Sequence, residues 1–438
     1  MRTTFSEEQL SDPAMASSEA VIRKCVHCGF CTATCPTYVL LGDELDSPRG
    51  RIYLIKDMLE GARQPTPEIV KHVDRCLSCL ACMTTCPSGV NYMHLVDHAR
   101  AYIEERYRRP LRDRLLRALL AWVLPHPRRF RIALRLARLA RPAAPLLTRI
   151  PALRPIAAML ALAPRRAAPP PARPSLQSPP SLARSRVALL QGCAEPLLRP
   201  EFGAAAVRLL EKAGFEVVFA PGEGCCGALV HHMGREAQAL ADARRNVDAW
   251  IREAERDGLT AILVTASGCG TVIKNYGFML RDDPAYAEKA ARISALARDV
   301  SEFLLELSLP PGDGRGLTVA YHAACSLQHG QKVTDAPRRL LAHAGYAVRT
   351  PIEAHLCCGS AGTYNILQPE IAGQLGARKA ANLARLDADV VVTGNIGCAL
   401  QIAQHSDIPV VHLVELLDWA TGGPAPASLS HFAQGSSA

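Results

Sequence analysis

Sixteen cysteines fall into four sets of four, and the first two sets have the same spacing. Each is a Cys-x₂-Cys-x₂-Cys-x₃-Cys-Pro run, formed by Cys25, Cys28, Cys31 and Cys35 in the first copy and by Cys76, Cys79, Cys82 and Cys86 in the second. Two such runs are typical of a pair of cubane 4Fe–4S clusters, in which the fourth cysteine of each run ligates the cluster of the other run. The spacing therefore predicts one cluster held by Cys25, Cys28, Cys31 and Cys86, and a second held by Cys76, Cys79, Cys82 and Cys35.

A structural zinc site is the alternative for these eight cysteines. A single Cys-x₂-Cys pair would leave zinc open, but two matching runs that each end in proline favour iron–sulfur clusters. Because such clusters take up and release electrons, the first hundred residues indicate a protein that transfers electrons.

The other eight cysteines form two sets that share an internal offset. Cys193 precedes the Cys225-Cys226-Gly pair by 32 positions, and Cys325 precedes the Cys357-Cys358-Gly pair by the same 32. Buried apolar cysteines would not repeat an offset, and a vicinal disulfide needs strained geometry and an oxidising compartment, so we expect ligand sites. The two expected ligand sets are Cys193, Cys225, Cys226 and Cys269, and Cys325, Cys357, Cys358 and Cys398. Four thiolates can hold an iron–sulfur cluster, which predicts one or two further clusters, and zinc is the alternative.

Four histidines lie near these two sets in the sequence, namely His231, His232, His322 and His355. A histidine beside a thiolate can shift the pKa of the thiol or donate a hydrogen bond to cluster sulfur. Packing in the core, without a role at the metal, is the alternative for each.

The elements around these cysteines repeat as well. Each cysteine position follows an apolar, strand-like run, at 187–190, 216–219 and 261–264 in the first half and at 317–321, 346–349 and 390–393 in the second. Helical patterns at 201–213, 235–255 and 369–386 separate these runs. Strands that alternate with helices indicate parallel α/β units, whose ligands lie beyond the carboxyl ends of the strands.

The expected fold is a multidomain α+β and α/β protein. An α-helical, bacterial-type two-cluster ferredoxin domain should precede two repeated α/β Cys-Cys-Gly domains that pack about a pseudo-twofold axis. The expected boundaries are a flexible leader at 1–20, the ferredoxin-like domain at 21–105, a basic helical segment with a Pro-rich linker at 106–185, the first Cys-Cys-Gly domain at 186–310, the second at 316–425, and a tail at 426–438.

The charge is concentrated in one segment. Between Arg106 and Arg186 the chain has nineteen arginines and a single acidic residue, Asp113, so this segment carries +18 while the whole protein carries +9. Arginines interrupt every apolar run before it reaches the roughly 18 residues of a membrane span. At 128–141, arginines form one helical stripe and Phe130, Leu134 and Ala137 form another. Two contacts fit this pattern: an anionic membrane surface, or the acidic surface of a partner protein.

Several motifs resemble the iron–sulfur subunit of bacterial glycolate oxidase, a glycolate dehydrogenase complex. These motifs are the first cysteine run from Cys25 to Pro36, the segments 42–46 and 48–53, the second run through Val90, and the segments 326–332, 357–364 and 395–398. The resemblance covers nearly the whole chain, but it does not include the arginine density of 106–186.

The resemblance implies an electron-transfer subunit rather than the site of substrate oxidation. FAD-containing partner subunits would oxidise glycolate to glyoxylate, and this chain would pass the electrons to a quinone-linked acceptor at the membrane. No secretory signal pattern is evident in the first twenty residues, so we expect a cytoplasmic protein, peripheral on the inner face of the cell membrane, with no nucleic-acid partner.

Two other functions are compatible with the same cysteines. One is the equivalent subunit of another respiratory flavin dehydrogenase, acting on lactate or glycerol 3-phosphate. The other is a Cys-Cys-Gly disulfide reductase, since these halves are similar to those of heterodisulfide reductase. In that enzyme the pattern ends in Cys-x-x-Cys, whereas no cysteine follows Cys269 or Cys398 at that spacing here.

Overall fold

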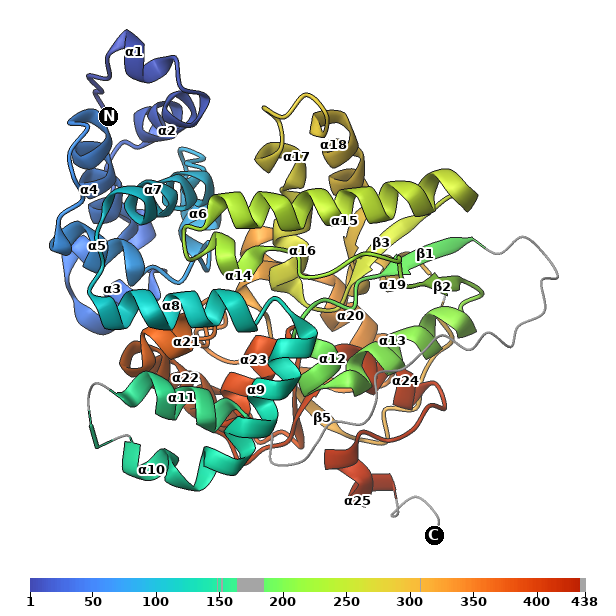
Figure 1. Cartoon of the computed structure of the whole chain (residues 1–438). Helices are drawn as coiled ribbons and strands as arrows, with labels where there is room; N and C mark the ends of the chain where they lie inside the picture. Colours follow the sequence, from blue (N-terminus) through green and yellow to red (C-terminus); the bar gives the residue numbers. More distant parts are fainter. Residues whose placement is uncertain (148, 151–152, 164–184, 308, 434–438) are drawn as a thin grey trace.

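The computed structural model describes residues 1–147, 149–150, 153–163, 185–307 and 309–433, and it places a helical N-terminal part beside two parallel sheets (Figure 1). The N-terminal part contains α1 (Glu7–Leu10), α2 (Pro13–Lys24), η1 (Phe30–Thr32), α3 (Pro36–Leu41), η2 (Glu44–Asp46), α4 (Pro48–Glu60), α5 (Pro67–Asp74), α6 (Ala81–Thr85) and α7 (Tyr92–Arg106). Helix α4 separates the two cysteine loops, as the apolar spacing predicts, and it buries Ile55, Met58 and Leu59 against α7 and α5.

The first twenty residues differ from the expected flexible leader. Asp12 caps α2 by accepting a hydrogen bond from the Ala14 amide, and Pro13 occupies the first turn, where its missing N–H costs nothing. Helix α2 then packs on α7 and buries Val21 and Ile22 in the N-terminal core. Asp12 followed by Pro13 is a sequence signal for the start of a helix, and the polar composition of the first twenty residues does not reveal it.

Each Cys-Cys-Gly half contains a four-stranded parallel sheet. The strands are β1 (Arg186–Leu189), β2 (Glu216–Val218), β3 (Ala261–Val264) and β4 (Ala297–Asp299), in the order β2-β1-β3-β4, and β5 (Thr318–His322), β6 (Ala347–Arg349), β7 (Val390–Thr393) and β8 (Val410–His412), in the order β6-β5-β7-β8. The six expected strands are confirmed to within two residues at each end. The edge strands β4 and β8 were not expected, because three residues are too few to show an alternating or apolar pattern.

The two halves are related by a pseudo-twofold arrangement. The helices of the first half are α12 (Glu195–Leu198), α13 (Pro200–Lys212), α14 (Ala228–His231), α15 (Glu236–Asp257), α16 (Ser267–Lys274), α17 (Tyr276–Met279), α18 (Ala287–Leu296) and α19 (Val300–Glu306). Those of the second half are η5 (Ser326–Gly330), α20 (Ala336–His343), α21 (Tyr364–Leu367), α22 (Pro369–Ala384), α23 (Ile396–Ala403) and α24 (Leu413–Ala420), followed by η6 (Ala427–Leu429) and α25 (Ser430–Ala433). The first long helix of each half packs on the last helix of the other, since α13 contacts α24 and α20 contacts α19. One continuous apolar core therefore spans both sheets.

The arginine-rich segment forms helices that cover the two halves. They are α8 (Leu111–Val123), α9 (Pro127–Ala140), η3 (Arg141–Ala143), α10 (Ala144–Leu147) and α11 (Arg154–Leu162). Helices α10 and α11 occupy part of the expected Pro-rich linker, and the rest of that linker, 164–184, lies outside the described residues, as does the end of the expected tail. Across the described ranges, every helix is too short or too polar to cross a bilayer.

Buried charges attach the N-terminal part to its neighbours. Arg109 and Arg117 both pair with Asp74 of α5, at 2.6 and 2.8 Å, so these two arginines fix α8 in place. On the other side of α7, the Asp97 carboxylate lies 3.2 Å from Nε2 of His231 in the first Cys-Cys-Gly half. The contact is close, because a Cβ at Gly234 would lie only 2.3 Å from the Arg100 carbonyl oxygen.

The Asp97–His231 pair has mutually shifted pKa values. Burial alone would raise the pKa of Asp97, but the His231 imidazole holds it well below its usual range. Burial alone would lower the pKa of His231, but Asp97 raises it above its usual value. A lowered carboxyl pKa gives stability that is lost as the pH falls below about 4, and a raised imidazole pKa gives stability that is lost as the pH rises through the folded value. The pair therefore stabilises the fold most at mildly acidic pH.

Replacing Asp97 with Asn should destabilise the protein by about 3 kcal/mol at pH 6, because it leaves a buried imidazolium without its counter-charge. The loss should be smaller at pH 9, because less of the His231 imidazole is protonated there than at pH 6. Anaerobic thermal unfolding at the two pH values measures the effect. Asp57→Asn, which alters an exposed ion pair with Arg63, is the control and should change the unfolding temperature little. An Asp97→Asn variant as stable as the wild type at pH 6 would contradict the role given to the pair.

Candidate metal centres

The first predicted cluster set is gathered around one cavity. Cys25, Cys28 and Cys31 line it from the first loop, and Cys86 lines it from the end of the second run. His27 and Gly29 have left-handed backbone conformations, with φ of 55° and 85°, which turn the loop around the cavity. The structure thus brings together the four cysteines that the sequence assigned to one cluster.

The second predicted set surrounds a neighbouring cavity. Cys76, Cys79 and Cys82 line it from the second loop, and Cys35 comes from the first run. Ser78 and Leu80 repeat the left-handed conformations of the first loop, with φ of 50° and 63°. The same backbone path at both loops explains why the fourth cysteine of each run reaches the cavity of the other.

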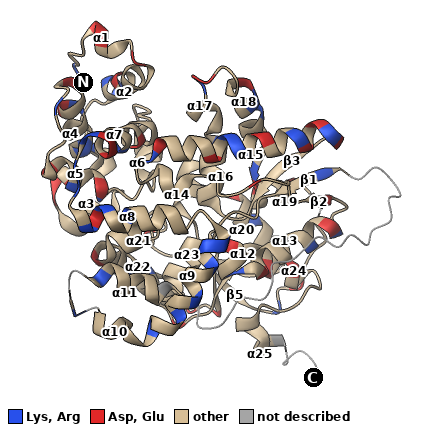
Figure 2. Ribbon diagram, in the orientation of Figure 1, with Lys and Arg blue, Asp and Glu red and all other residues tan. Residues whose placement is uncertain are grey.

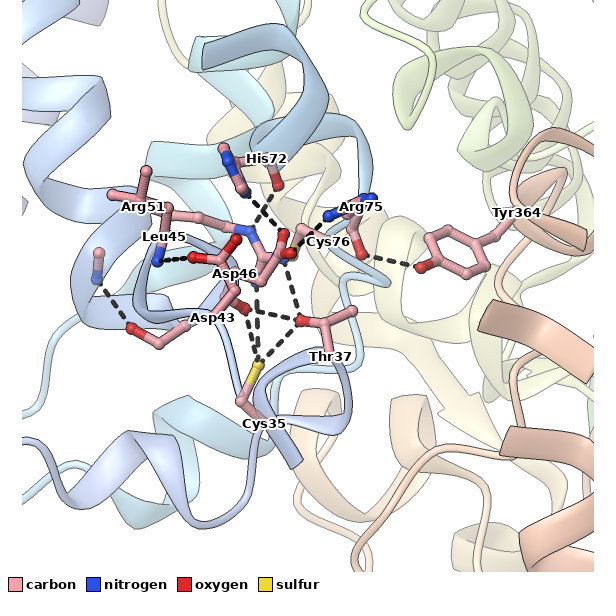
Figure 3. Close-up of polar contacts among 12 residues, drawn as sticks. Cys35, Thr37, Asp43, Leu45, Asp46, Arg51, His72, Arg75, Cys76 and Tyr364 are labelled. Carbon is pink, nitrogen blue, oxygen red and sulfur yellow. Dashed lines mark hydrogen bonds and ion pairs between the residues drawn. The ribbon is translucent and has the colours of Figure 1, made fainter. Parts of the chain in front are cut away.

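A buried polar network holds Cys35 in place (Figure 3). The Arg51 guanidinium, only 1% exposed, donates hydrogen bonds to Thr37 Oγ1 at 3.0 Å and to Asp46 Oδ1 at 3.2 Å, and lies 3.8 Å from Cys35 Sγ. Asp46 is also paired with Arg75 at 2.7 Å and with Nδ1 of His72 at 2.9 Å. Two arginines around one aspartate leave positive charge next to Cys35.

No motif in the sequence indicates this network. Asp46 and Arg51 lie within the two short segments, 42–46 and 48–53, that resemble the glycolate oxidase subunit. His72 and Arg75 come from α5 and the turn after it, more than twenty residues away. The partners of a buried charge pair can lie at any separation in the sequence, so only the folded structure identifies them.

The thiols of both cavities fit metal ligation. Burial raises the pKa of Cys31 to about 11. Burial, and then the proximity of Cys325, raises the pKa of Cys79 well above its usual value, and burial does the same for Cys82. Thiolates in such places need a cation beside them, and iron or zinc supplies one by displacing the thiol protons.

The two Cys-Cys-Gly sets lie beyond the carboxyl ends of the strands, as expected for parallel α/β units. Cys193, Cys225 and Cys269 follow β1, β2 and β3, and the corresponding cysteines of the second half follow β5, β6 and β7. The glycine after each cysteine pair has a positive φ, 84° at Gly227 and 89° at Gly359. Only glycine takes this conformation without strain, and it allows both thiols of the pair to face one site.

Within each set the thiols are close enough to share protons. Cys325 Sγ lies 3.7 Å from Cys357 Sγ. The pKa of Cys358 is lowered because its sulfur accepts hydrogen bonds from Cys357 and Cys398, and the pKa of Cys225 is lowered by Cys193 and Cys226 in the same way. Each set therefore offers grouped sulfur donors, which suit an iron–sulfur cluster or zinc.

The four candidate histidines have different surroundings. His231 and His232 point to Asp97 of α7. The backbone carbonyl of His355 accepts a hydrogen bond from His329 at 3.2 Å. His322 is the one of the four whose ring nitrogens are grouped with cysteine sulfurs, those of Cys358 and Cys398.

The second Cys-Cys-Gly set lies next to the ferredoxin part. Cys79 shares one buried apolar cluster with Cys325 and Cys357. The Tyr364 hydroxyl donates to the Arg75 carbonyl oxygen at 2.9 Å, which fixes the second half against the loop that carries Cys76 (Figure 3). Of the two Cys-Cys-Gly sets, the second is the one in contact with a predicted cluster site.

Comparisons with known proteins agree with these features. Residues 24–90 match the 4Fe–4S dicluster domain family, and residues 187–274 and 319–403 each match the cysteine-rich (CCG) domain family. The glycolate oxidase iron–sulfur subunit of Escherichia coli (strain K12) is 42% identical over 96% of this chain and 99% of its own length. The probable glycolate oxidase iron–sulfur subunit of Bacillus subtilis (strain 168) is 32% identical over 92% of this chain and 95% of its own length.

More distant relatives match less of the chain. Lactate utilization protein A of Bacillus licheniformis is 29% identical over 53% of this chain and 99% of its own length. The crystal structure of a hypothetical protein from Helicobacter pylori superposes with a TM-score of 0.55 over 95% of this chain and 74% of that chain. Its sequence identity is 11%, so this likeness shows the fold alone.

Arg51 should raise the reduction potential of the cluster at Cys35, because a buried cation favours the more negative, reduced state. Arg51→Gln should lower that potential by on the order of tens of millivolts and leave the other cluster unchanged. Arg49→Gln is the matched variant, since Arg49 lines the first cavity, and it should shift the other cluster instead. Redox titration monitored by electron paramagnetic resonance distinguishes the two, and identical potentials in both variants and the wild type would refute the effect.

Proposed function

The chain belongs to the family of glycolate oxidase iron–sulfur subunits, and from this we propose that it carries electrons within a glycolate-oxidising complex. A flavin-containing partner with bound FAD oxidises glycolate to glyoxylate, and this subunit passes the electrons toward a quinone-linked acceptor. The observation that carries the proposal is the similarity to the E. coli subunit at 42% identity over 96% of the chain. All sixteen cysteines fall inside the matched 4Fe–4S dicluster and cysteine-rich domains.

The clusters proposed for the two ferredoxin cavities are those assigned from the spacing. Cys25, Cys28, Cys31 and Cys86 hold one 4Fe–4S cluster, and Cys76, Cys79, Cys82 and Cys35 hold the other. Each cluster supplies a centre that accepts and releases one electron, while the chain supplies the thiolates, the buried Arg51 and the apolar loop walls. The grouping of these cysteines around two adjoining cavities, with Cys82 lining both, supports short electron transfer between the centres.

We place the next centre in the second Cys-Cys-Gly half. Cys325, Cys357, Cys358 and Cys398 are the proposed ligands there, and Cys193, Cys225, Cys226 and Cys269 are the corresponding residues of the first half. The contact of Cys79 with Cys325 supports a route from the ferredoxin part into the second half.

Two competing functions make different demands. A subunit of a lactate or glycerol 3-phosphate dehydrogenase would have the same electron path and a different flavin partner. Lactate utilization protein A matches only about half of this chain, which favours the glycolate assignment. A disulfide reductase would reduce a substrate at a Cys-Cys-Gly set, and a thiol assay on the complex with a disulfide substrate tests that alternative.

Cys31→Ser and Cys79→Ser should each remove one cluster, about four irons of roughly eight in the ferredoxin part. With glycolate as reductant, the flavin of the co-purified partner should still be reduced in both variants, while electron delivery to a quinone analogue stops. Iron and sulfide analysis with stopped-flow spectroscopy measures both effects. Met83→Leu, a change inside the second run that keeps every thiol, is the control. One zinc per cysteine set in place of iron, or flavin reduction by lactate and not by glycolate, would contradict the proposal.

The arginine-rich helices supply a surface that suits an anionic membrane. Helices α8 and α9 expose apolar side chains, with Trp122 58% exposed, Leu136 61% and Leu139 81%. The arginine positions of the same helices are blue in Figure 2. Arg131 and Arg135 are exposed on the same helix as Leu136. Exposed leucine and tryptophan between basic residues are typical of helices that lie in a lipid interface.

An apolar cavity beneath these helices suits the quinone-linked acceptor. Its volume is about 240 Å³, and it lies between α8, α9, α11 and the loops of both Cys-Cys-Gly halves. Leu134 of α9 forms part of one wall, and Ala194 and Gly397 form part of the other. Since Ala194 follows Cys193 and Gly397 precedes Cys398, an apolar acceptor in this cavity would lie beside both cysteine sets.

Binding to anionic vesicles should depend on this surface. Each basic residue near an anionic membrane contributes about 1 kcal/mol, so removing two should weaken binding about 30-fold. Co-sedimentation of the complex with phosphatidylglycerol vesicles, at low and high salt, compares the wild type with an Arg131→Gln, Arg135→Gln variant. Arg63→Gln, an exposed arginine of the N-terminal part, is the control. Binding that is insensitive to salt and to the double substitution would favour docking of this segment on the flavin partner.

A further inference from the structure

The second Cys-Cys-Gly set has a fifth candidate donor. His322 is the last residue of β5 and is 1% exposed. One of its ring nitrogens and the sulfurs of Cys358 and Cys398 all lie within 4.8 Å of one another. This is a spacing that a bound metal centre can bridge.

The imidazole of His322 is buried without a polar partner in the described part of the chain. Among the described residues, neither of its ring nitrogens has a hydrogen-bond partner. A buried polar group without a partner costs about 1–3 kcal/mol, so such groups are rare unless a ligand satisfies them. His412 provides the contrast, because it is equally buried but pairs both nitrogens, with the Thr265 carbonyl oxygen at 3.0 Å and the Val414 amide at 3.2 Å.

The repeated fold provides an internal comparison. His322 stands three residues before Cys325, and Leu190 stands three residues before Cys193, directly after the equivalent strand β1. Leu190 is buried as well, at 4% exposure, but its side chain offers no donor atom. The two halves therefore present different donor sets on the same backbone.

We propose that His322 is a ligand of the metal centre in the second half, together with thiolates of Cys325, Cys357, Cys358 and Cys398. This inference rests on the proposed function above, in which that set holds an iron–sulfur centre. Because the imidazole is neutral, the second centre has a higher reduction potential than a centre in which a thiolate occupied that position, as histidine ligation does in other clusters.

A second buried group adds to this difference. Lys379 of α22 is 2% exposed, and its ammonium group donates to the Glu353 carbonyl oxygen at 2.8 Å. Its charge interacts with the thiolates of Cys358 and Cys357. Positive charge and a neutral ligand both favour the reduced state, so the half that contacts Cys79 becomes the acceptor for electrons from the ferredoxin part.

The test is a nitrogen signal at the metal centre. Pulsed electron paramagnetic resonance on the anaerobic, wild-type complex should detect strong coupling from one directly bound ¹⁴N, in addition to the ferredoxin signals. His322→Leu, which copies the residue that the first half already buries at this place, should abolish that coupling. His322→Cys should also abolish it, keep the iron and lower the midpoint potential of the second centre. His355→Ala is the control and should retain the coupling.

The outcomes separate this inference from the function on which it rests. Iron in the second set without ¹⁴N coupling, or coupling that survives His322→Leu, would refute the ligand role while the electron-transfer function stands. Bound zinc that is lost in His322→Leu would support the ligand role and contradict the cluster proposed for this half. Reduction of the two ferredoxin clusters by glycolate is measured in the same samples, and its absence would contradict the proposed function alone.

Discussion

Thiolates held away from water need positive charge beside them, and this requirement organises the whole molecule. Twelve of the sixteen cysteines are buried, and several belong to the apolar cores themselves, as Cys25, Cys76 and Cys82 do in the N-terminal part. Without metal, burial raises the pKa of several of these thiols, as it does for Cys79 and Cys82, and so favours their protonated form. A bound metal centre would cross-link the two cysteine loops through their thiolates. The stability of the N-terminal part is therefore coupled to cluster loading, since the cavities and the core share side chains.

The four cysteines that are not buried are Cys28, Cys31, Cys86 and Cys269. Three of these four belong to the set around the first cavity, so that set is the most accessible of the four. The set around Cys35 and the set around Cys325 lie deeper. An electron donor outside the chain would therefore approach the first set most closely, while the deeper sets are insulated from solvent.

Much of the site was predictable from the sequence, because cysteine spacing is a local property. The runs at 25–35 and 76–86 fix which thiols share a cavity, and the equal offsets of the two Cys-Cys-Gly pairs reveal the repeat. The partners of those thiols were not predictable. Arg51 contacts His72 and Asp46 only in the folded chain, and the spacing of these residues in the sequence does not indicate the contacts. Helix α2 was not predicted because the first twenty residues are mostly polar. Four histidines looked equivalent in the sequence. In the structure, His231 and His232 contact Asp97, more than a hundred residues away, and not the cysteines.

The pseudo-twofold arrangement explains why the two Cys-Cys-Gly halves differ. A single ferredoxin part cannot contact two symmetry-related sites in the same way, so each half meets a different surface of it. The first half contacts α7 through the charged pair of His231 and Asp97, and the second contacts the cysteine loop through Tyr364 and Cys325. The first contact holds the parts together, whereas the second brings two sulfur sites together. In the proposed function, the position of this one neighbour gives the symmetric scaffold a direction for electron transfer. His322, whose counterpart in the first half is Leu190, lies in the half that would receive the electrons.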